Sequence, residues 1–355
     1  MFKKLDWQLN GAIIFLAIAS LLILASSSPH LFWKQALWYL FGFTAVFGFA
    51  NIDWRWLSGQ LWLRQSIYWL VLGLLFITYF MAPPIRGVRS WLVLGPFQFQ
   101  FSELAKLSLI IVYAGFFAAR YFESALLRNI IYSFLYLLPN LLMVLVQPDL
   151  GTAVILFGIW AGFVLLSGIT WRQFFAGVLI MAVLGVFAWT SFLKSYQKER
   201  IVSFLFPDID PLGVSYNVIQ SKIAIGSAGF FGKGFGQGTQ VQLGFLPEAQ
   251  ADFIFAAFTE EWGLLGGFLI IAAFWLILYR IARIGLHTGG NYAKFAALGT
   301  LLVLILHFVF NIGSNLGLLP VVGVTFPFFS YGGSSLLTLF ILIGIIQSIN
   351  KQSSF

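Results

Sequence analysis

Cysteine is absent from this 355-residue sequence, and charged residues make up only 9% of it. Without cysteine the chain can form neither a disulfide nor a thiolate metal site. The shortage of charge is equally restrictive, because an ordinary soluble domain carries about 25% charged residues. A soluble fold of this length would have too little polar surface to face water. The sequence therefore excludes the class of soluble globular proteins.

Apolar and aromatic residues take the place of the missing charge, at 60% and 19% of the chain. Trp and Tyr are typical of membrane interfaces, where one part of the ring is apolar and the other is wet. Lys and Arg outnumber Asp and Glu by 20 to 12. In an apolar chain this excess indicates cytoplasmic loops and contact with anionic membrane lipids rather than a nucleic-acid partner.

Ten mostly apolar stretches approach the roughly 20 residues that a membrane-spanning helix requires. They lie at 9–28, 34–50, 66–82, 103–119, 130–147, 151–168, 173–192, 253–280, 295–316 and 333–350. No small-residue cleavage site follows the first stretch, so we interpret it as a span and not as a removed signal peptide. The sequence predicts an all-α polytopic membrane protein that forms one transmembrane domain over 1–355.

The distribution of Lys and Arg predicts the orientation of these helices. With both termini in the cytoplasm, the short inside segments hold most of the basic residues, as the positive-inside rule requires. Three outside segments, 82–102, 193–252 and 311–332, contain polar residues, Gly and Pro among apolar ones. Irregular backbone at membrane depth is tolerated where protein or a wet cavity satisfies it. We therefore expect one extracytoplasmic cavity, built from these three segments.

Asp252 lies where the large outside segment 193–252 meets the eighth span. Pro247 is suited to the first turn of a helix, which would place Glu248 and Asp252 four residues apart on one face. A carboxylate at this boundary is well placed to act as a general base on a hydroxyl. The alternative is a charge that merely caps the eighth helix.

Glu103 and Lys106 are three residues apart at the start of the fourth span, where Ser102 can serve as the helix cap. They form either a structural ion pair or part of a functional site. Arg86 and Arg89 lie just upstream in a short outside loop, against the positive-inside expectation. A guanidinium group can bind phosphate with two hydrogen bonds, so this cluster favours a phosphate ligand over simple snorkelling to lipid headgroups.

Two further segments are less specific. Gln147-Pro148-Asp149 joins the fifth and sixth spans almost without a loop, and Asp149 is expected to cap the sixth helix. The glycine-rich stretch 226–238 surrounds Lys233 but is not a phosphate-binding Walker loop, because Gly234 stands where that motif needs Ser or Thr. Contact with substrate remains an open alternative for this stretch.

Glu260, Glu261 and His307 lie well inside spans, where ionisable side chains must face protein or water. For Glu260 and Glu261, hydrogen bonding to neighbouring helices is at least as good an interpretation as catalysis. His307 is a lone histidine in the ninth span, which is more typical of a hydrogen-bonded interior residue than of a metal ligand.

The motifs in and beside the outside segments form a pattern when they are taken together. They are Gly87-Val88-Arg89-Ser90-Trp91, Ser102-Glu103-Leu104-Ala105-Lys106, Gln147-Pro148-Asp149-Leu150-Gly151-Thr152, Asp210-Pro211-Leu212-Gly213, Leu246-Pro247-Glu248 with Asp252-Phe253-Ile254-Phe255, and Phe328-Phe329-Ser330-Tyr331-Gly332-Gly333-Ser334-Ser335. In these motifs the chain resembles the SEDS family of bacterial cell-wall polymerases, and its RodA type most. Phe101 and Ala251 depart from the family's usual Pro and Thr, but no charged position is changed.

The resemblance implies a peptidoglycan glycosyltransferase that polymerises lipid II at the outer face of the bacterial cytoplasmic membrane, for cell elongation or division. It implies lipid II and undecaprenyl-pyrophosphate-linked glycan as substrates, and a class B penicillin-binding protein as partner. The family's essential aspartate falls on Asp252, and the acid and base of its Ser-Glu-Leu-Ala-Lys motif fall on Glu103 and Lys106. Candidate pyrophosphate-binding residues are Arg86, Arg89, Glu103, Lys106 and Lys233, with Asp149, Glu248, Gln147 and Ser330 in supporting places.

The chemistry that this reaction needs is modest. Asp252 would take a proton from the acceptor hydroxyl, which attacks the anomeric carbon with inversion as the lipid pyrophosphate leaves, so a single base suffices. A divalent cation, Mg²⁺ or Mn²⁺, would assist the leaving pyrophosphate, although the sequence contains no evident cage of ligands for one. The alternatives are a flippase for lipid-linked precursors and a membrane scaffold for a transpeptidase.

Overall fold

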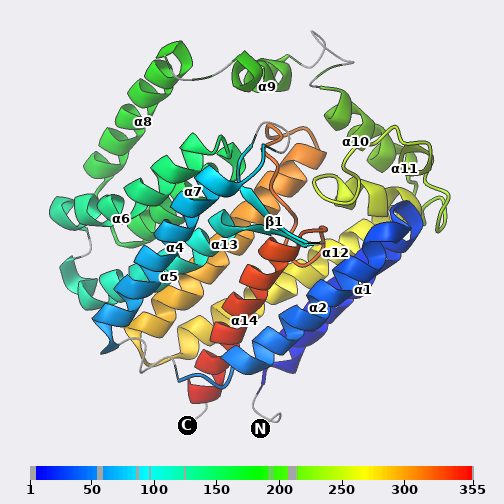
Figure 1. Cartoon of the computed structure of the whole chain (residues 1–355). Helices are drawn as coiled ribbons and strands as arrows, with labels where there is room; N and C mark the ends of the chain where they lie inside the picture. The colour runs from blue at the N-terminus through cyan, green and yellow to red at the C-terminus, as the bar shows by residue number, and fades with distance from the viewer. Residues whose placement is uncertain are drawn as a thin grey trace.

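A computed structural model describes residues 5–53, 59–84, 88–95, 97–123, 125–191, 193, 195–206, 213 and 215–353 of the chain. Long helices run side by side and form a bundle, from which α8 alone among the described long helices stands apart (Figure 1). They are α1 (Trp7–Ser27), α2 (Pro29–Phe49), α4 (Leu61–Met81), α5 (Phe101–Ala119), α6 (Leu127–Val146), α7 (Leu150–Leu166), α8 (Trp171–Ser191), α12 (Ile254–His287), α13 (Asn291–Asn315) and α14 (Gly333–Ser353).

Each of the ten predicted ranges overlaps one of these helices. Among the described residues, 8 helices are long and apolar enough to cross a membrane. Of the remaining two, α7 has 17 residues and α2 has 21. The all-α, multi-pass architecture is therefore confirmed, and a full set of ten crossings stays a prediction.

The start of α12 differs from the prediction. The helix begins at Ile254, and the residues before it, 247–253, form turns. Glu248 has a left-handed φ of 54°, and its carbonyl oxygen accepts from the N–H groups of Ala251 and Phe253. Because this conformation interrupts a helical run, Pro247 does not open α12. The expectation that Glu248 and Asp252 share one helical face is wrong.

The first and last helices of the bundle are joined at one end. Asp6 caps α1 and accepts two hydrogen bonds from the Arg280 guanidinium on α12, at 2.8 and 2.6 Å. Gln347 on α14 accepts from the Asp6 N–H and donates to the Asn10 side chain, both at 2.9 Å. The start of α1 and the end of α14 therefore lie at the same end of the bundle (Figure 1), as an even number of crossings requires.

The short helices and the strands lie mainly in the half of the molecule away from the start of α1 and the end of α14. They are the antiparallel strands β1 (Trp91–Leu94) and β2 (Phe97–Gln100), in which Trp91 pairs with Gln100, and the short helices α9 (Ser195–Leu205), α10 (Tyr216–Ser227) and α11 (Thr239–Gln242). The helices α9, α10 and α11 lie at the end away from the start of α1 (Figure 1), and α10 packs against α12. The strands pack against α4 and α14.

The glycine-rich segment 226–238 crosses α12 and bonds to it, backbone to backbone. Gly263, inside α12, has φ 77° and ψ 177°, which kinks the helix. At this kink, the N–H groups of Lys233 and Gly234 donate to the carbonyls of Glu260 and Glu261, each at 3.0 Å. A Cβ atom on Gly232 or Gly263 would overlap backbone atoms of the opposing segment. The crossing therefore requires glycine at both positions.

Candidate functional site

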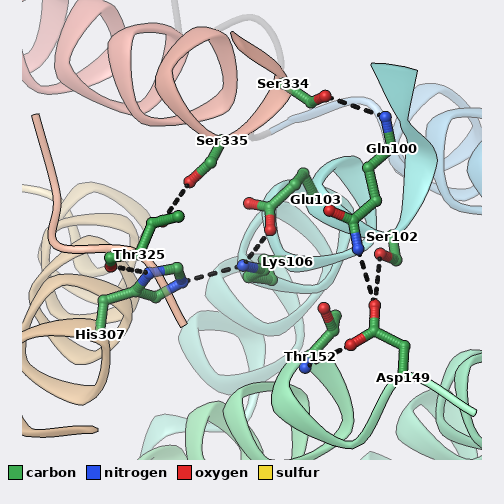
Figure 2. Close-up of polar contacts among 10 residues, drawn as sticks. All are labelled: Gln100, Ser102, Glu103, Lys106, Asp149, Thr152, His307, Thr325, Ser334 and Ser335. Atoms are coloured by element: carbon green, nitrogen blue, oxygen red, sulfur yellow. Dashed lines mark hydrogen bonds and ion pairs between the residues drawn. The ribbon is translucent and has the colours of Figure 1, made fainter. Parts of the chain in front are cut away.

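The strand β2 runs directly into α5, and this places the start of α5 beside α7 and α14. Gln100 precedes α5 without a side-chain cap, and its amide group donates to Asp149 Oδ2 at 2.7 Å. Ser102 donates to the same oxygen at 3.3 Å (Figure 2). Ser102 is thus not the cap of α5, as the sequence predicted, because its hydroxyl is turned to a carboxylate, which is a stronger acceptor than water.

Asp149 and Gln147 hold the junction between α6 and α7. Asp149 Oδ1 accepts from the Thr152 N–H at 3.1 Å, which confirms the predicted cap of α7. The buried Gln147 side chain donates to the Leu75 carbonyl at 2.9 Å, and the backbone carbonyl of Gln147 accepts from the Arg89 N–H at 3.4 Å. These contacts hold α4, α7 and the hairpin of β1 and β2 around the start of α5.

Lys106 is buried, with a side chain only 2% exposed, and forms an ion pair with Glu103 at 2.8 Å. This pair confirms the predicted contact across one helical turn. The Lys106 ammonium also lies 2.9 Å from Nε2 of His307 on α13 (Figure 2). An ammonium group can only donate, so Nε2 accepts and the proton of a neutral imidazole lies on Nδ1. Nδ1 then donates to the Thr325 carbonyl at 3.0 Å.

The segment between α13 and α14 closes over this group. The hydroxyls of Thr325 and Ser335 are 3.1 Å apart, and Ser334 Oγ accepts from the Gln100 N–H at 2.9 Å (Figure 2). The start of α14 therefore contacts both the β1–β2 hairpin and Thr325, the residue whose carbonyl accepts from His307.

Asp252 lies half-buried in the turns before α12. Its backbone carbonyl accepts from the amides of Asn311 and Asn315 on α13, at 3.0 and 2.8 Å. The carboxyl group lies beside Gly323, since a Cβ atom on that glycine would be 4.0 Å from Asp252 Oδ2. The position of the Asp252 backbone is therefore fixed, while its carboxyl group faces the segment between α13 and α14.

Residues 323–325 lie between the Asp252 carboxyl and the group that contains Lys106. The Asp252 carboxyl lies against Gly323, whereas Lys106 reaches Thr325 through His307. Only Val324 lies between Gly323 and Thr325, so the Cα atoms of these two residues are at most about 7 Å apart. The structure thus brings a carboxylate and a buried carboxylate–ammonium–imidazole group to neighbouring positions of one short segment.

Ser330 fastens this segment to the turns that carry Asp252. Its hydroxyl donates to the Ala251 carbonyl at 2.6 Å and accepts from the Phe326 N–H at 2.8 Å. The next residue, Tyr331, donates its N–H to the Gln250 carbonyl at 2.9 Å. Glu248 is half-buried in the same turns. Ser330 therefore helps to hold the backbone turns that carry Asp252.

Lys233 contacts a different carboxylate. Its ammonium lies 2.6 Å from Glu260 on α12, and it also donates to Ser227 and Thr239. The neighbouring Glu261 accepts from Ser26 on α1. Both acids thus bond to neighbouring elements, in agreement with the structural interpretation of the sequence.

The remaining predicted residues are only partly defined. Arg89 is exposed and holds its place through its backbone. Arg86 and the motif residues Asp210, Pro211 and Leu212 lie outside the described residues. Within the described part of the chain, no group of three or more His, Asp or Glu side chains is placed to hold a metal ion.

Sequence reasoning missed several residues of the site. Gln100, Asn311 and Asn315 were not singled out, although two asparagines four residues apart in an apolar span are a recognisable signal. His307 was expected to be a hydrogen-bonded interior residue, which is confirmed, but its contact with Lys106 was not foreseen.

The fold and the site define a multi-pass helical membrane protein with a buried polar site in the half of the bundle away from its termini. The chain belongs to the FtsW/RodA/SpoVE family of cell cycle proteins, whose model matches residues 5–355.

Individual relatives agree with this membership. The chain is 41% identical to the peptidoglycan glycosyltransferase MrdB of Escherichia coli over 269 residues, which are 75% of this chain and 72% of MrdB. It is 33% identical to the stage V sporulation protein E of Bacillus subtilis, over 91% of this chain and 87% of that protein.

Solved structures agree as well. A chain of a peptidoglycan synthase complex is 31% identical, with a TM-score of 0.85 over 99% of both chains. The rod shape determining protein RodA of Thermus thermophilus is 26% identical, with a TM-score of 0.74 over 100% of this chain and 99% of that one.

Proposed function

We propose that this protein is a peptidoglycan glycosyltransferase, which polymerises lipid II into glycan strands at the outer face of the bacterial cytoplasmic membrane. Membership of the family and the similarity to MrdB, which is named for this activity, support the reaction. One observation carries the proposal. The Asp252 carboxyl lies beside Gly323, and His307, which contacts the buried Lys106, bonds to Thr325 of the same short segment.

Asp252 is the general base. It lies at the boundary between the segment 193–252 and the bundle, where an acceptor sugar can approach from water while its lipid stays in the bilayer. The carboxylate takes the proton of the acceptor hydroxyl, and the oxygen attacks the anomeric carbon of the growing chain. The bond to the lipid pyrophosphate breaks, and the configuration at that carbon inverts. Two asparagine amides on its backbone carbonyl hold this base in place.

Lys106 stabilises the charge that develops on the departing pyrophosphate. A buried ammonium is effective here because low dielectric strengthens its interaction with an anion. Glu103 forms an ion pair with the lysine ammonium, and Nε2 of His307 accepts a hydrogen bond from it, which fixes the direction of the ammonium. We assign His307 as a positioning residue that acts through Lys106.

Among the other cations, Arg89 at the exposed hairpin is suited to guide the phosphate towards Lys106. Arg86 is proposed for the same task from the sequence alone. Lys233 remains a candidate, but its ammonium already pairs with Glu260. Its contacts support a role in holding the glycine-rich segment on α12.

A class B penicillin-binding protein is the partner that we propose. The support for it is the similarity to a chain of a peptidoglycan synthase complex. The site lies in the half of the bundle that the distribution of Lys and Arg predicts to face the outside.

The proposed function is tested by polymerisation of purified lipid II with the protein and its partner, comparing wild type with Asp252→Asn. The matched control is Asp53→Asn, which removes an exposed carboxylate near the end of α2. We expect long glycan strands from wild type and control, and none from an equally folded Asp252→Asn. Undiminished strands from Asp252→Asn would remove it as the base. Transfer of lipid II across liposomes without strands would favour the flippase.

A further inference from the structure

A cavity of about 630 Å³ opens between α4, α5 and α6, far from the site described above. Its walls come from the first turns of α4, the last turns of α5 and the middle of α6. Since α1 begins at the same end, this is the end that carries both termini and that is predicted to face the cytoplasm.

Two arginines line the cavity at its outer end. Arg120 directly follows α5 and is exposed, with its guanidinium 4.3 Å from the ring centroid of Phe116. Arg64 lies in the first turn of α4, with its guanidinium against Gly115 and 5.9 Å from the Tyr292 ring centroid. A Cβ atom on Gly115 would be 2.5 Å from Arg64 Cζ, so the glycine leaves room for this guanidinium.

Much of the remaining wall of the cavity is apolar. Phe116 and Pro139 line it, and Leu135 and Trp69 are 53% and 60% exposed at its rim. In a bundle that spans a membrane, these exposed side chains contact lipid chains. Among the described residues that line the cavity, two arginines and no aspartate or glutamate are found.

Cations at the depth of the headgroups, with an apolar groove above them, match the shape and charge of a phospholipid. A guanidinium binds phosphate with a fork of two donors, and basic pockets between helices on the cytoplasmic side attract anionic headgroups. We propose that this cavity binds one anionic glycerophospholipid of the cytoplasmic leaflet. Arg64 and Arg120 contact its phosphate, and an acyl chain lies along Phe116, Leu135 and Pro139.

Native mass spectrometry of the delipidated full-length protein tests the proposal, with phosphatidylglycerol and phosphatidylethanolamine of identical chains as probes. We expect wild type to retain phosphatidylglycerol with a preference on the order of tenfold, because two basic residues near the surface act on its net charge. The double variant Arg64→Gln/Arg120→Gln should abolish that preference.

Arg128→Gln is the matched control. Arg128 lies at the same end on α6, but its side chain is 66% exposed and lies 3.9 Å from Glu123, outside the cavity. This variant should keep the wild-type preference. Loss of the preference in Arg128→Gln to the same extent would overturn the proposal, because surface charge alone would then explain it.

A further variant leaves both arginines in place. Gly115→Ala places a methyl group on the Arg64 guanidinium and should lower phosphatidylglycerol retention, with helix content and monodispersity checked in parallel. Equal retention of the two lipids by wild type would reduce the cavity to an apolar contact with lipid. Preferred retention of undecaprenyl phosphate over phosphatidylglycerol would assign the cavity to a polyprenyl carrier instead.

Discussion

The buried pair of Glu103 and Lys106 places two opposite charges where water does not reach them. Removal of one partner leaves the other charge uncompensated, which costs about 3–5 kcal/mol, whereas removal of both avoids this cost. We therefore expect Lys106→Met to unfold at a much lower temperature than Glu103→Gln/Lys106→Met. Thermal unfolding in detergent measures the difference, and both variants should fail to polymerise lipid II. Equal stability of the two variants would contradict a charged pair.

His307 offers a second test at this scale. His307→Leu removes the acceptor for Lys106, so we expect polymerisation at saturating lipid II to fall by about tenfold or more, in line with the loss of one oriented interaction. His307→Gln should recover much of the rate, because its amide oxygen can accept from the same ammonium.

The control for this test is Thr300→Val on the same helix. The Thr300 hydroxyl donates to the Ala296 carbonyl of its own helix. Its replacement should leave the turnover rate unchanged. A merely structural role of His307 would lower the amount of folded protein in both His307 variants without any rescue of the rate by Gln.

Sequence spacing predicted the local contacts among these residues. Glu103 and Lys106 lie one helical turn apart, and Asp149 precedes a helix, so each contact follows from a few residues of sequence. Asn311 and Asn315 bond to Asp252 across about sixty positions of chain. Hydropathy carries no information about such a pairing, because any helix of the bundle could supply an amide. The error at Ser102 has the same origin, since its acceptor lies on another helix.

At the scale of single elements, the backbone crossing at Gly263 is the most constrained feature. Gly263→Ala forces a side chain into the left-handed region, which costs about 1–3 kcal/mol before any overlap with the opposing backbone is counted. We expect a clear drop in the unfolding temperature and weaker attachment of the segment 226–238, measured as faster proteolysis. Gly73→Ala in α4, where a Cβ would meet nothing within 4 Å, should be neutral or slightly stabilising.

The start of α12 shows what local pattern cannot predict. Pro247 is a good first residue of a helix, yet the chain turns because Ser330 and Tyr331 bond to the Ala251 and Gln250 carbonyls. These tertiary bonds outweigh the local preference for a helix. The consequence is functional, since Asp252 lies in a turn and not on a helical face beside Glu248.

At the scale of the whole molecule, the orientation can be tested directly. Because the chain has no cysteine, single cysteines can be introduced without background labelling. We expect Gln237→Cys, exposed in the glycine-rich segment, to react with a membrane-impermeant maleimide on intact spheroplasts. Gly289→Cys, exposed between α12 and α13, should react only after permeabilisation. The reverse pattern would invert the proposed position of the active site.

The ten apolar stretches predicted where each helix lies, but not which helices pack together. In the structure α1 packs on α12 and α14 on α2, although these helices are far apart in the chain. An apolar helix in a bilayer has no preferred apolar face, so periodicity cannot identify its neighbours. Among the described residues of α8 no side chain is buried, which the high hydropathy of that stretch gave no reason to expect. The helix stands apart from the other long helices (Figure 1).

The hydrogen bonds between Asp6 and Gln347 make the two ends of the chain neighbours, and this allows a circular permutation. A short linker from α14 to α1 would join ends that already lie together, and new ends could be opened at the exposed Gly289, at the same end of the bundle. Every helix would keep its direction through the bilayer. The order of helices along the chain is therefore separable from their arrangement in space.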